Sequence, residues 1–85
     1  MIELKHAILD ELGLHARSAS QLVRAASKFK CAIMVGMPNK MVDAKSILGI
    51  MLLVMKQGDE LTLTFDGEDE TEAAQAIEAF LKKNI

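Results

Sequence analysis

Hydrophobic and polar positions follow two different periods in the first third of the chain. Over residues 2–8, apolar residues and His6 alternate with charged or small residues, which predicts a strand with one buried face. Gly13 then marks a turn. From Ala16 to Phe29, apolar residues recur at helical spacing with basic and amide side chains between them, which predicts an amphipathic helix of about 13 residues.

The middle of the chain predicts a hairpin followed by a short helix. Two apolar segments, residues 31–35 and 40–44, flank the turn-forming residues 36–39. Ser46 has a side chain able to cap a helix, and the residues after it are apolar at spacings too close for one buried stripe. A short helix that leaves some apolar surface exposed accounts for this pattern.

The last third predicts a strand and then a helix. Residues 60–65 alternate leucine or phenylalanine with threonine, between two turns that contain glycine. The segment after residue 67 begins with acidic residues, has apolar residues at helical spacing, and ends with two lysines. This charge order is favourable at both ends of a helix dipole.

The resulting element order is strand, helix, strand, strand, short helix, strand, helix. It predicts an α+β fold, an open-faced β-sandwich in which three helices pack on one face of a mostly antiparallel four-stranded sheet. We find no internal repeat or linker, so residues 1–85 are expected to form a single domain. A chain of 85 residues buries about 60% of its unfolded surface, enough for one core.

Charge and composition narrow the class of protein. The net charge of −2 argues against general binding to nucleic acid backbones. Cys31 is the only cysteine, which excludes an internal disulfide and a cysteine-only metal site. The longest apolar run, residues 47–55, is far shorter than the ~20 residues that cross a bilayer, and the first residues do not have a signal-peptide pattern. We therefore expect a cytoplasmic protein with no membrane insertion and no cofactor.

His15 is the first candidate for chemistry. If a helix begins near Ala16, His15 lies at its amino-terminal end, where free N–H groups and the helix dipole attract anions. A neutral imidazole is a nucleophile near pH 7, and the Arg17 guanidinium can pair with phosphoryl oxygens. No catalytic triad order, zinc motif or phosphate-binding glycine loop accompanies them, which favours a carrier over an enzyme.

Simpler explanations of the same residues remain open at this point. His15 alone is more often a surface residue that begins a helix, and Arg17 more often a solvated helix charge. His6 has apolar alternation partners, which favours a half-buried, hydrogen-bonded histidine over a second catalytic group.

Two segments resemble the signature sequences of the HPr family, the histidine-containing phosphocarrier proteins of the bacterial sugar phosphotransferase system. They are GLHARSA at residues 13–19 and AKSILGIM at residues 44–51, and the likeness extends over essentially the whole chain. The resemblance implies that His15 accepts a phosphoryl group from phosphorylated enzyme I, on Nδ1 of the ring, and donates it to sugar-specific enzyme IIA domains. It also implies that Arg17 and the backbone amides of Ala16 and Arg17 contact the phosphoryl group.

The resemblance further implies a regulatory site and a partner interface. Ser46 matches the serine that a dedicated kinase/phosphorylase modifies in many relatives, which connects it to a catabolite-control transcription factor. The expected interface with enzyme I and enzyme IIA domains comprises Ser18, Ser20, Arg24, Lys28, Lys45, Ile47, Leu48 and Met51. A monomer is expected.

Two alternative functions remain open. One is a regulatory paralogue that acts mainly through Ser46 and a transcription-factor partner, which the presence of His15 disfavours. The other is a carrier of the nitrogen-related phosphotransferase chain. The main departure from the family is Ser18, where the family has proline, and this change restores an N–H and a hydroxyl at the helix start.

Overall fold

The computed structural model describes residues 1–85 and confirms the predicted order of elements. These are β1 (Ile2–Ala7), α1 (Ala16–Ala26), β2 (Ala32–Met37), β3 (Lys40–Asp43), α2 (Ile47–Met51), β4 (Glu60–Asp66) and α3 (Glu70–Asn84). Helix α1 ends at Ala26, earlier than expected, because the N–H groups after Ser27 bond three residues back: Lys28 to Ala25 and Phe29 to Ala26. No helix is long and apolar enough to cross a membrane.

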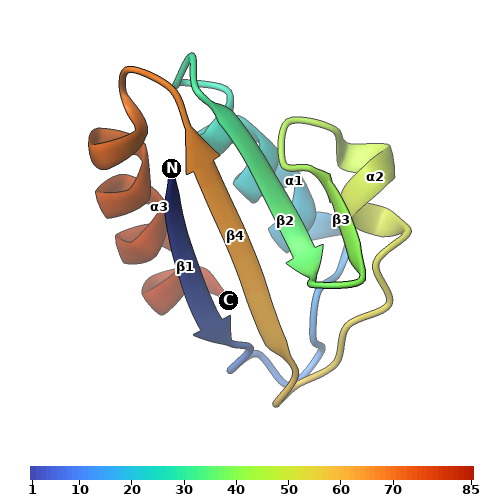
Figure 1. Ribbon diagram of the computed structural model, residues 1–85. Helices are drawn as coiled ribbons and strands as arrows, with labels where there is room; N and C mark the ends of the chain where they lie inside the picture. Colours follow the sequence, from blue (N-terminus) through green and yellow to red (C-terminus); the bar gives the residue numbers. More distant parts are fainter.

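The sheet is antiparallel throughout, in the order β1-β4-β2-β3, and the helices cover one of its faces (Figure 1). Strand β4 lies between β1 and β2, and the residues that its alternation predicted to face inward, Leu61, Leu63 and Phe65, are fully buried. Helices α1 and α3 contact each other, and α2 contacts α1 at the other side of the layer. The observed fold is the predicted open-faced sandwich.

His6 on β1 is half-buried, as predicted, but its Nε2 atom is buried without a hydrogen-bond partner. The expectation of a hydrogen-bonded histidine is wrong for this atom. The neighbouring strand contributes Leu61, directly opposite His6 in the register, and a hydrocarbon side chain offers no acceptor.

An unpartnered buried nitrogen destabilises the fold, and this gives the first prediction. We expect His6→Phe to raise the free energy of unfolding by about 1 kcal/mol, since a ring of similar shape fills the site without a polar atom to desolvate. Urea denaturation of the two proteins measures the difference. An equal or lower stability of the variant would contradict this account of His6.

The loop between β1 and α1 is held by two other parts of the chain. The N–H groups of Leu9 and Asp10 donate to the carbonyl of the carboxyl-terminal residue, Ile85, at 2.7 and 3.0 Å. The Leu14 N–H donates to the Met55 carbonyl at 3.0 Å. Three segments that are distant in sequence therefore meet where the chain enters α1.

Candidate functional site

His15 is the residue that immediately precedes α1, in an extended conformation with φ −130° and ψ 174°. The N–H groups of Ala16 and Arg17 have no acceptor in the structure, as expected for the first residues of a helix. The His15 side chain is 28% exposed, so the ring is accessible while its backbone is fixed. The placement predicted from the sequence is correct: the imidazole lies at the positive end of a helix dipole.

Ser18 holds the backbone of His15 in place. Its hydroxyl accepts a hydrogen bond from the His15 N–H at 3.2 Å and donates one to the His15 carbonyl at 3.0 Å. Ser18 is only 2% exposed, which corrects its expected role in the partner interface. Its side chain points inward because Ala19 and Leu22, on the same side of α1, are fully buried. Ser18 therefore acts on His15 and not on a partner surface.

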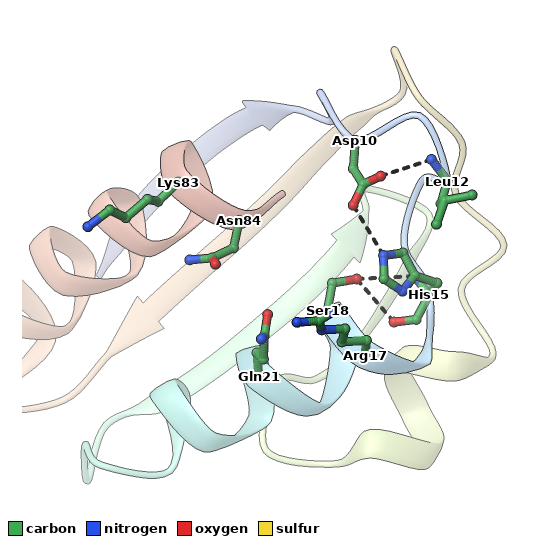
Figure 2. Close-up of a pocket in the computed structure, with 8 residues that line it drawn as sticks. All are labelled: Asp10, Leu12, His15, Arg17, Ser18, Gln21, Lys83 and Asn84. Carbon is green, nitrogen blue, oxygen red and sulfur yellow. Dashed lines mark hydrogen bonds and ion pairs between the residues drawn. The ribbon is translucent and has the colours of Figure 1, made fainter.

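Asp10 contacts the ring itself, and sequence reasoning missed it. Its Oδ2 lies 3.1 Å from Nε2 of His15, and its Oδ1 accepts the Leu12 N–H at 2.9 Å (Figure 2). The Leu12 N–H and then the His15 ring hold the pKa of the Asp10 carboxyl below its usual range. The available signal was an aspartate three residues before the turn glycine, a spacing too common to identify a ring contact.

A cleft of about 300 Å³ lies beside His15, between the β1–α1 loop and the end of α3 (Figure 2). Arg17 and Gln21 line it from α1, and Lys83 and Asn84 line it from α3. Two of these four side chains are cationic, which suits an anion held near the ring. No group of three or more His, Cys, Asp or Glu side chains in the structure is arranged to hold a metal ion.

Helix α2 presents the second predicted site. The Ser46 hydroxyl accepts the Gly49 N–H at 3.1 Å and caps the helix, as its sequence position predicted. The apolar residues around it are exposed, and we refer to them as the α2 patch: Ile47 (45%), Leu48 (72%), Met51 (43%), Leu52 (60%) and Val54 (79%). Leu52 and Val54 were not in the expected interface. They are part of the exposed α2 patch because the chain leaves the helix after Met51 and turns them outward.

The basic residues expected at the interface differ in their availability. Arg24 on α1 and Lys28, just beyond the end of α1, are exposed, and Ser20 is half-buried. Lys45 is different, because its ammonium group donates to the carbonyls of Phe29 and Cys31 at 2.7 and 2.9 Å. Its charge is used to hold the loop between α1 and β2, which corrects its expected role as a steering charge.

Known proteins are similar to this chain over most of its length. The model of the family described as the PTS HPr component phosphorylation site matches residues 2–83. The chain is similar to the phosphocarrier protein HPr of Lysinibacillus sphaericus, with 49% identity over 74 residues that cover 87% of this chain and 84% of the relative. It is 42% identical to the phosphocarrier protein HPr of Xylella fastidiosa over 77 residues, 91% of this chain and 86% of that protein.

Solved structures support the same relationship and add an observation on assembly. The crystal structure of HPr-C-His from Thermoanaerobacter tengcongensis superposes with a TM-score of 0.92 at 43% identity, covering 99% of this chain and 94% of that one. An HPr dimer from the same organism has a TM-score of 0.76 at 43% identity, covering 98% and 95% of the two chains. The monomer expected for this protein therefore stays a prediction. From the family match and the sequence identities, this chain belongs to the HPr family of phosphotransferase-system phosphocarrier proteins.

Proposed function

We propose that this protein receives a phosphoryl group on His15 from phosphorylated enzyme I and passes it to enzyme IIA domains of a sugar phosphotransferase system. The observation that carries the proposal is the position of the His15 ring: part-exposed, at the first turn of α1, beside two unpaired N–H groups. A group that must be reached by two proteins in succession needs such an open position. A deep pocket would admit neither.

The residues around His15 would act on the phosphoryl group in two ways. The free N–H groups of Ala16 and Arg17 can donate to its oxygens, and the Arg17 guanidinium beside the cleft can neutralise its charge. These groups are in place before transfer, so little reorganisation is needed when the charge arrives. The site therefore positions and stabilises a reactive phosphoramidate without an enzyme's own acid or base.

The proposal is tested with the purified protein, phosphoenolpyruvate and enzyme I. We expect one phosphoryl group per chain, stable in alkali and labile in acid as a phosphohistidine is, and located at His15 by mass spectrometry. The phosphorylated protein should then lose its phosphate to an enzyme IIA domain. If no enzyme I phosphorylates the chain, the proposal fails.

The α2 patch is the proposed docking surface for both partners. Exposed apolar side chains of this size are costly on so small a domain unless a partner covers them. The patch adjoins α1, where Arg24 is exposed, and Lys28 is exposed just beyond the end of this helix; both can attract an acidic partner. Docking there would bring a partner to the side of the molecule on which α1 begins.

Phosphorylation of Ser46 is the proposed regulation. The residue lies at the border of the α2 patch, so a phosphate there would place negative charge within the docking surface. We expect Ser46→Asp to keep the helix cap, since aspartate caps as well as serine, and to slow transfer from enzyme I several-fold. Transfer reactions quenched at successive times measure the rate, and Thr71→Asp, at an exposed position of α3, is the matched control. Equal rates for the two variants would contradict the proposal.

The role of Ser18 gives a further prediction. We expect Ser18→Ala to lower the free energy of unfolding by about 1 kcal/mol and to slow transfer, because the His15 backbone loses both hydrogen bonds to the hydroxyl. Ser18→Pro should remain active, within about tenfold of the native rate, since the helix start tolerates proline. An inert native protein beside an active Ser18→Pro variant would overturn this view of Ser18.

A further inference from the structure

The contact between Asp10 and His15 determines which nitrogen of the ring carries the proton. Oδ2 of Asp10 and Nε2 of His15 are 3.1 Å apart, a hydrogen-bond distance that requires one of the two atoms to donate. The Asp10 carboxyl has its pKa lowered by the Leu12 N–H and by His15, so near neutral pH it is ionised and can only accept. Nε2 is therefore the donor.

The other nitrogen, Nδ1, is then left with its lone pair in the neutral ring. No hydrogen bond at the helix start engages Nδ1: the His15 side chain caps no N–H group, and Ser18 contacts only the His15 backbone. The lone pair of Nδ1 is therefore available.

We propose that Asp10 is a positioning residue that holds His15 in the tautomer with the proton on Nε2 and so keeps Nδ1 nucleophilic. This inference rests on the proposed function of His15 as a phosphoryl acceptor. Asp10 itself is fixed by the turn: its second oxygen accepts the Leu12 N–H at 2.9 Å, so the carboxylate stays in place when the ring changes charge. The carboxylate is 29% exposed, next to a ring that is 28% exposed.

The transfer step follows from this arrangement. The Nδ1 lone pair forms a bond to phosphorus as the bond between phosphorus and the donor's leaving atom breaks, and the bonding electrons return to that atom. The His15 ring becomes cationic, with phosphorus on Nδ1 and the original proton still on Nε2. No proton leaves the ring, and the Asp10 carboxylate lies against the new positive charge. Phosphoryl donation to the next protein reverses these changes.

Asp10→Asn separates this role from the structural role of Asp10 in the turn. An asparagine side chain has one acceptor oxygen. The Leu12 N–H can only donate, whereas the His15 ring can change its tautomer, so we expect the oxygen to accept from Leu12. The asparagine NH₂ group then faces Nε2, which must accept, and the proton moves to Nδ1. The same exchange next to a catalytic histidine selects the wrong tautomer in serine proteases. The variant should keep its fold and lose its nucleophile.

The primary measurement is ¹⁵N NMR of the unphosphorylated protein in alkaline buffer, where ring-nitrogen shifts identify the protonated atom. We expect the proton on Nε2 in the native protein and on Nδ1 in Asp10→Asn. The second measurement is the rate at which the small donor phosphoramidate phosphorylates His15, which needs no docking. We expect the rate to fall by about tenfold or more in Asp10→Asn. The matched control is Asp43→Asn, since Oδ1 of Asp43 accepts the Lys45 N–H at 2.9 Å in the same kind of turn and contacts no histidine.

The outcomes distinguish the two proposals. A native protein that accepts phosphate while carrying its proton on Nδ1 overturns the role of Asp10 and leaves the carrier function standing. An unchanged tautomer in Asp10→Asn also overturns that role, whatever the rate. A native protein that accepts phosphate from neither phosphoramidate nor enzyme I overturns the carrier function, while the NMR result still decides how Asp10 sets the ring.

Discussion

His15→Ala is expected to reduce phosphorylation by enzyme I to background while leaving the fold intact. The ring supplies the only proposed nucleophile. Among the other polar side chains of the cleft, two are cationic and two are neutral amides, the Ser18 hydroxyl is buried, and the Asp10 carboxylate accepts the Leu12 N–H. The fold should survive because the ring is part-exposed and its only side-chain partner is Asp10. Helix α1 remains held by Ser18, which bonds to the backbone of residue 15.

Transfer of radiolabelled phosphate from phosphoenolpyruvate measures this, with circular dichroism as the test of folding. The matched control is the other histidine: His6→Phe should be phosphorylated like the native protein, since His6 lies on β1 beneath the helices. Acid-labile phosphate that persists on a folded His15→Ala variant would show that the acceptor is elsewhere.

Gly13→Ala is expected to destabilise the protein by about 2–4 kcal/mol and to slow transfer in the fraction that folds. Gly13 has φ +69°, a conformation that L side chains rarely adopt. A Cβ there would collide with the Met55 carbonyl oxygen and lie 2.9 Å from Cα of Lys56. That same carbonyl accepts the Leu14 N–H, so relieving the collision breaks the bond that fixes the residue before His15.

Urea denaturation gives the stability, and phosphoramidate labelling of the folded protein gives the effect on the site. Gly58→Ala is the matched control, because Gly58 has φ +93° and a Cβ there meets nothing within 4 Å. The Gly58→Ala variant has the backbone strain without the collision, and its free energy of unfolding should fall by about 1 kcal/mol. Equal effects of the two substitutions would mean that the contact with Met55 does not hold the loop.

The elements and the position of His15 were predictable because they depend on local patterns. Alternation identified β1 and β4, the change of period at Ala16 identified α1, and the cap at Ser46 identified α2. The location of His15 at the end of a helix was predicted because it directly precedes Ala16, where the helical period begins. His6 illustrates the limit of such reasoning, because alternation showed that it is half-buried but not that Nε2 has no partner.

What the sequence by itself determined was the order of strands and helices, the buried face of each, and the histidine at the start of α1. Only the tertiary structure decided three contacts. Asp10 lies within hydrogen-bond distance of the His15 ring, and the buried Ser18 hydroxyl bonds to the His15 backbone. The Lys45 ammonium group donates to two backbone carbonyls. The physical reason is that periodicity reports which face of an element is apolar, a property of neighbouring residues. Hydrogen-bond partners depend on how the β1–α1 loop is tied to Met55 and Ile85, and these contacts form only when distant segments meet.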